Sequence, residues 1–243
     1  MTKLSVNLNK IALLRNSRGR DYPNVRDFAE KLIAFGVHGI TVHPRQDERH
    51  ITRQDTYVLG ELLADNKDVE FNIEGYPSDD FLTLVHEVKP TQCTLVPDSP
   101  DQLTSDHGWD LATESPFLNK VCSQLNDKGI RSAIFLDPEI EQVKRVPETK
   151  AKRIELYTEE YASSFESAEV FERYRLAAQQ ASDLGIGVNA GHDLDLSNLE
   201  KFLSIGNILE VSIGHALTIE SIEQGMATVV AQYLGICNAQ SSN

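Results

Sequence analysis

Two imidazoles and two guanidiniums follow a short apolar run in the segment GITVHPRQDERHI. The run, Gly39–Val42, is β-branched and apolar, as a buried strand usually is. The four polar side chains that follow it are His43, Arg45, Arg49 and His50. Histidine transfers protons near neutral pH, and arginine binds phosphate or carboxylate oxygens. The segment therefore predicts acid–base chemistry on an anionic substrate.

Five of the seven histidines occur at or beyond the ends of predicted strands. His43, His192 and His215 come directly after a strand, while His50 and His107 fall in the loops that follow strands. The carboxyl ends of parallel strands meet at one edge of a sheet, where active sites gather. We therefore expect most of these imidazoles to share one face of the protein.

The run VEFNIEG carries carboxylates inside a predicted strand. Because side chains alternate between the faces of a strand, Glu70, Asn72 and Glu74 share one face, opposite Phe71 and Ile73. A carboxylate in the interior is costly unless it is paired or functional. Glu70 is therefore a candidate catalytic group. A similar alternation over residues 4–9 predicts that polar side chains line a cavity.

Two Gly-His pairs, in NAGHDL and SIGHAL, follow the seventh and eighth predicted strands. The second pair, Gly214-His215, also begins a helix. Backbone N–H groups at a helix start bind phosphate well, and barrels often bind phosphate after their last two strands. These pairs predict a phosphate site.

The elements that position these residues alternate along the whole chain. Predicted strands cover Leu4–Leu8, Gly39–Val42, Val69–Ile73, Gln92–Val96, Ser132–Leu136, Ile154–Tyr157, Gly187–Ala190 and Leu209–Ile213. Predicted helices cover Val25–Phe35, Thr52–Ala64, Asp79–Val88, Phe117–Asn126, Ala168–Leu184, Ser197–Ile205 and Ile219–Leu234. Eight strands alternating with helices predict an α/β fold, a (β/α)₈ TIM barrel. A doubly wound sheet is the competing fold, but it usually has a Gly-rich loop after its first strand, which is absent here.

No linker or low-complexity tract divides the chain. We expect one barrel domain over residues 1–237 and a disordered tail over residues 238–243. The long polar connection from Pro97 to Pro116 is expected to be an active-site loop.

Composition narrows the classes of partner. The net charge of −14 disfavours nucleic acid and anionic membranes. Residues 1–53 nevertheless hold ten Lys/Arg against five Asp/Glu, which suits small anions. The N-terminal segment lacks the pattern of a signal peptide, no stretch is apolar enough to cross a membrane, and the three cysteines form no CxxC pair. We expect a cytoplasmic protein.

Metal and Schiff-base chemistry are weaker alternatives. A metal site would need His43, Glu70, His192 and His215 to converge, but no H-x-H or H-E-x-x-H motif is present to fix two ligands on one element. A Schiff-base aldolase needs an inward lysine, and only Lys10 is near a strand end. We expect no metal.

Six segments, in order along the chain, carry a family resemblance: VNLNKIALLRNSRG, GITVHPRQDERHI, EFNIEG, LVPD, VNAGHDL and IGHA. The chain resembles the pyridoxine 5′-phosphate synthase family from about Leu4 to the final helix. The resemblance implies a (β/α)₈ barrel with extra helices that assembles as a homo-octamer without metal or organic cofactor. It also implies two phosphorylated substrates, 3-amino-2-oxopropyl phosphate and 1-deoxy-D-xylulose 5-phosphate, which are joined to give pyridoxine 5′-phosphate, phosphate and water.

The same resemblance implies residue roles. His43 and Glu70 match proton acceptors, and His192 matches a proton donor. Positions matching contacts to the aminooxopropyl phosphate are Asn7, Arg18, Asp193, Gly214 and His215. Positions matching contacts to the deoxyxylulose phosphate are Asn9, Lys10, Arg45, His50 and Thr104.

Two positions depart from the family pattern. Many members carry Asp-His where this chain has Asn9-Lys10, and glycine is common where it has Asp193. Both changes bear on substrate affinity rather than on reaction type. Two rival hypotheses remain: another sugar-phosphate lyase or isomerase on the same barrel, and a non-catalytic oligomeric barrel.

Overall fold

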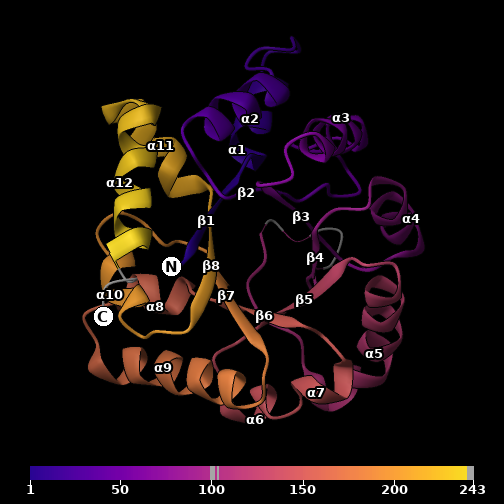
Figure 1. Cartoon of the computed structure of the whole chain (residues 1–243), viewed down its shortest axis with the longest axis vertical. Helices are drawn as coiled ribbons and strands as arrows, with labels where there is room; N and C mark the ends of the chain where they lie inside the picture. The colour runs from indigo at the N-terminus through magenta and orange to yellow at the C-terminus, as the bar shows by residue number, and fades with distance from the viewer. Residues whose placement is uncertain (99–101, 103, 240–243) are drawn as a thin grey trace.

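Eight parallel strands form a closed barrel in the order β1 to β8 (Figure 1). The computed structural model describes residues 1–98, 102 and 104–239. The strands are β1 (Lys3–Asn7), β2 (Gly39–Val42), β3 (Glu70–Gly75), β4 (Gln92–Leu95), β5 (Arg131–Leu136), β6 (Arg153–Tyr157), β7 (Gly187–Gly191) and β8 (Ile208–Ile213). Each predicted strand coincides with one of these to within two residues at either end, so the predicted TIM barrel is confirmed.

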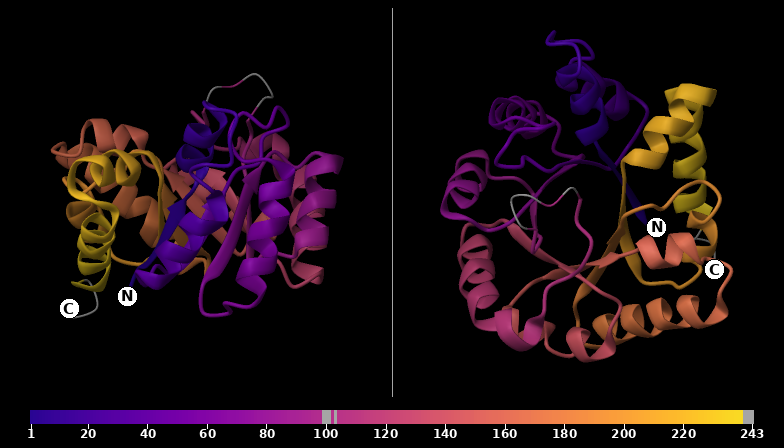
Figure 2. Two further views of the ribbon diagram at one scale, coloured as in Figure 1. Left: turned by 90° about the horizontal axis from the view of Figure 1, so that it is seen from above. Right: turned by 180° about the vertical axis from the view of Figure 1, so that it is seen from behind.

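Helices surround the barrel (Figures 1 and 2). They are α1 (Asn9–Asn16), α2 (Val25–Ala34), α3 (Arg53–Ala64), α4 (Asp79–Val88), α5 (Leu111–Asp127), α6 (Ile140–Val143), α7 (Val146–Thr149), α8 (Glu159–Ser163), α9 (Ala168–Asp183), α10 (Leu199–Leu203), α11 (His215–Gln224) and α12 (Met226–Ala239). No helix in the described ranges is long and apolar enough to cross a membrane.

Three predicted boundaries at the helices are wrong. The single helix predicted over Ile219–Leu234 is two helices, because Gly225 takes a φ of +87° and ends α11. Helix α5 begins at Leu111 and contains Pro116, so the loop after β4 is shorter than predicted. Helix α12 continues to Ala239, which removes residues 238 and 239 from the predicted tail; residues 240–243 lie outside the described part.

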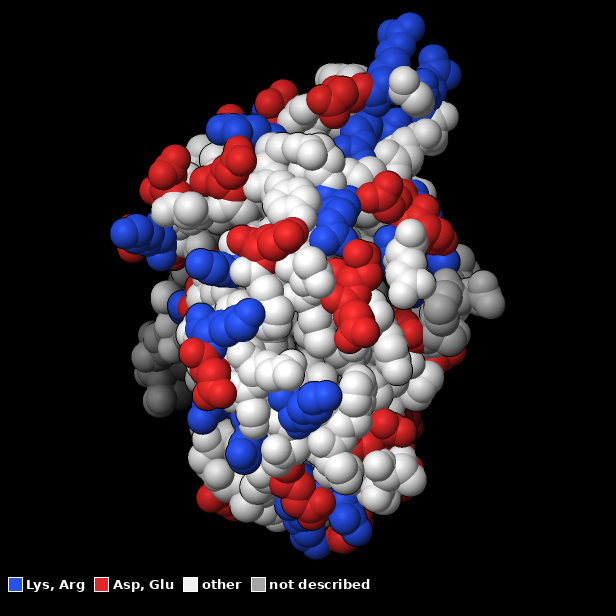
Figure 3. Space-filling model, turned by 90° about the vertical axis from the view of Figure 1, so that its right-hand side faces the viewer, with Lys and Arg blue, Asp and Glu red and all other residues white. Residues whose placement is uncertain are grey.

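The apolar core lies between the barrel and its helices. Outward side chains of the strands, such as Ile40 and Val42 of β2, are fully buried against it. On the outer face shown in Figure 3, basic and acidic side chains are largely interspersed. The hydrophobic effect therefore acts mainly in the shell outside the sheet.

The inside of the barrel is polar instead. The hydroxyls of Ser5 and Thr41 lie 2.7 Å apart, and Thr94 donates to Asn72 at 3.0 Å. All four side chains are buried. TIM barrels commonly fill this space with layers of branched apolar side chains. Here hydrogen bonds across neighbouring strands hold the interior together, as the polar alternation in the sequence predicts.

Candidate active site

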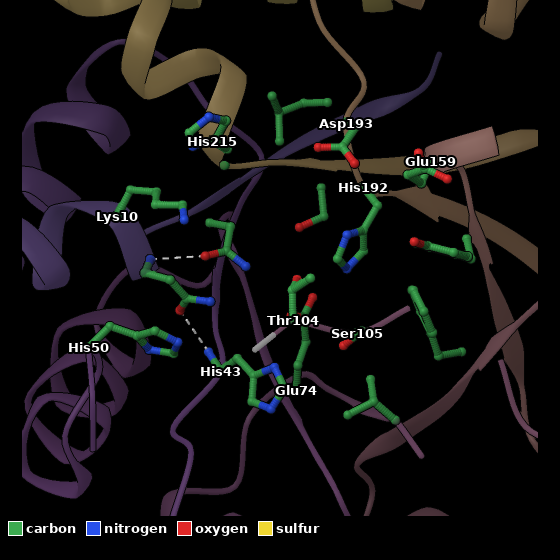
Figure 4. A pocket seen from close by; sticks show the side chains of 18 of the residues that line it. Lys10, His43, His50, Glu74, Thr104, Ser105, Glu159, His192, Asp193 and His215 are labelled. Carbon is green, nitrogen blue, oxygen red and sulfur yellow. Dashed lines mark hydrogen bonds between the residues drawn. The ribbon is translucent and has the colours of Figure 1, made fainter. Parts of the chain in front are cut away.

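A pocket of about 530 Å³ opens at the carboxyl ends of the strands (Figure 4). This size is typical of sites for small organic molecules. Its lining includes Asn7, Asn9, Lys10, His43, Arg45, Arg49, His50, Glu74, Thr104, Ser105, Glu155, Tyr157, Glu159, His192, Asp193, Gly214 and His215.

His43 stands at the end of β2 and is buried. Its backbone N–H donates to Asn9 Oδ1 at 3.0 Å, which ties the end of β2 to the start of α1 (Figure 4). Burial lowers the pKa of His43 well below its usual value, and the positive charge of Arg45 lowers it further. The imidazole is therefore neutral at physiological pH and has a free lone pair for a proton.

His50 lies beside His43, with ring centroids 6.4 Å apart. Burial, then the charges of Arg45 and Arg49, lowers the pKa of His50 to about 4. The N–H of Ile51 donates to His50 Nδ1 at 2.9 Å, so the neutral ring carries its proton on Nε2. His50 can thus donate a hydrogen bond to an anion.

The loop that carries these residues is fixed from two sides. Asn16 Nδ2 and Arg15 Nη2, both on α1, donate to the carbonyl of His50 at 2.8 and 3.2 Å. Arg15 also forms a bidentate ion pair with Asp55, whose carboxylate completes a capping box with Thr52 at the start of α3. Helices α1 and α3 therefore hold between them the loop after β2, which carries His43, Arg45, Arg49 and His50.

Lys10 adds a further cation on the same side of the pocket (Figure 4). Within the described part of the chain, no hydrogen bond or ion pair occupies its ammonium group. Its charge contributes to lowering the pKa of His50. Lys10, Arg45 and Arg49 thus form one cationic wall, and the neutral His50 lies beside them.

Glu74 supplies a buried carboxyl group from the end of β3. Burial raises its pKa well above the usual value, and the nearby carboxyls of Glu155 and Asp98 raise it further. Glu155, on β6, is buried at the pocket wall, and burial together with the charge of Glu210 raises its pKa to about 8. A carboxyl group with a pKa near neutrality can both accept and donate a proton.

Glu70, the carboxylate predicted to be catalytic, lies outside the pocket. It is at the opposite end of β3 and pairs with Lys3 and Arg131. Burial would raise its pKa, but the hydrogen bonds from Arg131 and Lys3 lower it overall. The predicted catalytic role of Glu70 is therefore wrong, because the residue lies at the end of β3 that faces away from the pocket. Glu70 and Glu74 share the inward face, but four residues of strand separate them by about 13 Å.

His192 follows β7 with a φ of 86°, and Asp193 continues with a φ of 57°. Such positive values are uncommon outside glycine and often mark functional turns. Thr158 stabilises the turn by donating to the carbonyls of Gly191 and His192. The turn directs the imidazole into the pocket (Figure 4).

The ring of His192 packs against two aromatic side chains. Its centroid lies 5.4 Å from that of Phe135 and 5.1 Å from that of Tyr157. Burial lowers the pKa of His192, and the negative charges of Asp193 and Asp98 oppose that effect. A neighbouring carboxylate therefore favours the protonated form, as a proton donor requires.

The start of α11 offers a second anion position. Gly214 precedes the helix, and His215 and Ala216 form its first turn at the pocket wall. The first N–H groups of a helix have no partner inside it and carry partial positive charge. A Cβ on Gly214 would come within 3.0 Å of the Asn7 side chain, so glycine allows the close approach of β1 and β8.

The structure thus brings together eleven of the thirteen predicted site residues. The pocket contains Asn7, Asn9, Lys10, His43, Arg45, His50, Thr104, His192, Asp193, Gly214 and His215. Glu70 and Arg18 are not among its lining residues, and Arg18 lies exposed beyond the end of α1. No group of three or more His, Cys, Asp or Glu side chains in the described ranges could hold a metal ion.

Sequence reasoning overlooked two buried carboxyl groups, Glu155 and Asp98. The register pairs Glu155 with Asn189 and Phe135 and places it on the inward face of β6. The segment RIELY contains the signal that could have identified Glu155. In it the apolar Ile154 and Leu156 flank Glu155, so the glutamate faces the side of the strand opposite to them.

Comparison with known proteins gives the family. A sequence model described as "Pyridoxal phosphate biosynthesis protein PdxJ" matches residues 4–239. A protein of Bacteroides thetaiotaomicron named pyridoxine 5′-phosphate synthase is 50% identical over 236 residues, covering 96% of this chain and 98% of its own. A protein of the same name from Agrobacterium fabrum is 46% identical over 248 residues, covering 99% of both chains.

Solved structures of low sequence identity share the fold. The 3-hexulose-6-phosphate synthase of Salmonella typhimurium superposes with a TM-score of 0.66 at 10% identity, covering 98% of this chain and 100% of its own. Phosphoribosylanthranilate isomerase of Thermotoga maritima gives a TM-score of 0.58 at 11% identity, with the same coverage. These two show the barrel alone, whereas the sequence matches show more: the chain belongs to the PdxJ family of pyridoxal phosphate biosynthesis proteins.

Proposed function

We propose that this pocket catalyses the pyridoxine 5′-phosphate synthase reaction. The enzyme condenses 3-amino-2-oxopropyl phosphate with 1-deoxy-D-xylulose 5-phosphate and releases phosphate and water. Family membership and the names of the relatives support the reaction. The pocket geometry supports the assignment of roles that follows.

Two anion positions suit two phosphorylated substrates. The cationic wall of Lys10, Arg45 and Arg49 receives the phosphate of the deoxyxylulose substrate, and the neutral His50 donates a hydrogen bond to it. The start of α11 at Gly214-His215, with Asn7 beside it, receives the phosphate of the amino substrate. The reacting carbon and nitrogen atoms then lie between these positions, which is where the acid–base groups point (Figure 4).

Three groups divide the proton transfers. His43, neutral in its buried position, accepts a proton from substrate carbon or nitrogen. Glu74 takes the role first assigned to Glu70, because it lies in the pocket and burial raises its pKa well above the usual value. His192 donates a proton to a leaving oxygen, and Asp193 and Asp98 favour its charged form. Imine formation, ring closure and dehydration need such a set of bases and acids.

The convergence of His43, Glu74 and His192 between two anion positions is the observation that carries these assignments. The test is a mass-spectrometric assay with both substrates and a chelator, comparing the wild type with His192→Ala. We expect pyridoxine 5′-phosphate from the wild type and a loss of at least about a hundredfold in the variant. A folded wild-type protein that binds both phosphates but forms no product would contradict the proposal and favour another sugar-phosphate reaction.

We also propose that the barrel is one domain and forms a homo-oligomer, an octamer by family resemblance. Apolar side chains exposed on α1 and α11 support an assembly: Leu13, Leu14, Ile219 and Ile222, the last with 72% of its surface exposed. Such side chains next to each other often mark a contact with another subunit. Light scattering of the purified protein measures the assembly, and a monomer at micromolar concentration would contradict it.

A further inference from the structure

Asp98 is a buried carboxylate that no role above explains by itself. It follows β4 in the segment LVPD and is 4% exposed. Its Oδ2 accepts from Arg45 Nη2 at 2.5 Å and from Ser105 Oγ at 2.8 Å. Its Oδ1 is buried and has no hydrogen-bond partner among the described residues. A half-satisfied buried carboxylate is costly, so its presence requires a compensating function.

The ion pair with Arg45 is more enclosed than a surface pair. The side chains of Arg45 and Asp98 are 8% and 2% exposed. Arg45 Nη1 also donates to the carbonyl of Gln102 at 3.2 Å. A guanidinium carries five N–H donors in a rigid plane, so fixing two of them fixes the directions of the rest. Asp98 thus sets the orientation in which Arg45 faces the pocket.

The negative charge of Asp98 also reaches the acid–base groups. It raises the pKa of Glu74, where the carboxyls of Glu155 and Glu210 act in the same direction and Arg45 acts against them. It raises the pKa of His192 together with Asp193, again against Arg45. The charge of Asp98 therefore acts on both Glu74 and His192.

We propose that Asp98 is a positioning residue of the reaction: it holds Arg45 in the orientation that binds substrate phosphate, and it supplies a fixed negative charge beside Glu74 and His192. The inference rests on the proposed function. Asp98 itself is not among the residues that line the pocket, so in this role it acts through Arg45 and through its charge.

The test compares Asp98→Asn with two other variants. Asp68→Asn makes the same charge change at an exposed position before β3, at the opposite end of the barrel. Ser105→Ala removes a hydrogen bond to Asp98 but keeps its charge. Circular dichroism and thermal unfolding establish that each variant is folded before it is assayed.

Two readouts distinguish positioning from a purely structural role. The first is titration calorimetry with 1-deoxy-D-xylulose 5-phosphate, which measures binding without turnover. We expect the Kd for this substrate to rise about tenfold or more in Asp98→Asn, because misplacing one charge-assisted hydrogen bond has an effect of this size. The kcat–pH profile should also move to lower pH by about half a unit or more, because loss of the negative charge lowers the pKa of both Glu74 and His192. Ser105→Ala should raise Kd without moving the profile, and Asp68→Asn should change neither.

The outcomes separate this inference from the proposed function. An active wild type together with unchanged Kd and pH profile in Asp98→Asn overturns the positioning role. If Asp98→Asn does not fold, an unchanged Kd in Ser105→Ala overturns it instead. A wild type that binds the ketose phosphate but makes no product overturns the proposed function, while a Kd change in Asp98→Asn would still support the orientation of Arg45.

Discussion

Exchanging Glu74 or Glu70 for glutamine separates catalysis from stability within a single strand. Both carboxylates belong to β3 and face inward, and glutamine has nearly the same shape. Glu74 lies in the pocket, whereas Glu70 lies at the other end in ion pairs with Lys3 and Arg131. Glu74→Gln should therefore lower the turnover rate and leave the stability nearly unchanged. Glu70→Gln should lower the stability and leave the turnover rate nearly unchanged.

For Glu74→Gln we expect kcat to fall by about 10² to 10⁴, the usual contribution of a general base or acid. Stability should change little. Burial raises the pKa of Glu74 well above its usual value, so its charged form contributes little to folding, and glutamine keeps nearly the same shape.

For Glu70→Gln we expect the reverse. The Glu70 side chain is 15% exposed, and its loss leaves the partly buried Arg131 without its carboxylate partner. A cost of about 1–3 kcal/mol in the free energy of unfolding is typical for such a charged hydrogen bond. For a chain of this size the melting temperature would fall by roughly 2–10 °C. The turnover rate should stay within about threefold of the wild type, because Glu70 lies outside the pocket.

The assay combines mass-spectrometric product formation at saturating substrate with thermal unfolding of the same preparations. The reasoning fails if Glu70→Gln abolishes turnover at an unchanged melting temperature while Glu74→Gln remains active. That pattern would return the catalytic role to Glu70 and would mean that the pocket is not the reaction site.

Three further predictions follow from the same contacts. Asp55→Asn breaks the pair with Arg15 and the capping box of α3, so we expect a loss of about 2–4 kcal/mol at pH 7 by urea unfolding. Because the pKa of Asp55 is lowered, its contribution is fully present above the ordinary value of 3.8 and is lost as the pH falls through the lower folded-state pKa, so a difference from wild type that does not shrink as the pH falls below 3.8 would contradict this assignment. Gly191→Ala places a Cβ 2.5 Å from Glu155 Oε1, so we expect at least a tenfold loss of kcat or failure to fold, and an active, stable variant would show that Glu155 can move freely. Asp193→Asn removes a charge that raises the pKa of His192, so the high-pH limb of the kcat profile should move to lower pH, and an unmoved limb would argue against His192 as the proton donor.

The barrel could be predicted from the sequence because its strands are short, apolar on one face and bounded by turns. Helix α1 escaped prediction, since it begins at Asn9, two residues after β1 ends, and its apolar face is short. The division of the last helical region depends on the backbone angle at Gly225, and a glycine in a helical pattern does not reveal its φ.

The error at Glu70 has a clear physical origin. Side chains alternate between the two faces of a strand, so the sequence shows which residues of β3 face inward. The alternation does not show which of these inward residues lies in the pocket. Position along the barrel axis depends on strand tilt and on the register with neighbouring strands, such as Gly39 opposite Glu70. That register is a property of the whole barrel. Strand direction alone nevertheless favours Glu74, which lies near the carboxyl end of β3, over Glu70, which begins the strand. The ion-pair partners of Glu70, Lys3 and Arg131, are distant from it in sequence.

The hydrogen-bonded interior of the barrel has a consequence for how stability varies with temperature. Unfolding a chain of 243 residues ordinarily raises the heat capacity by roughly 3 kcal/mol/K. Exposing apolar surface produces that increase, whereas exposing polar surface reduces it. Ser5, Thr41, Asn72 and Thr94 occupy space that apolar side chains fill in other barrels. The heat-capacity change should therefore fall below the average for this length, which would give a flatter stability curve and weaken cold denaturation.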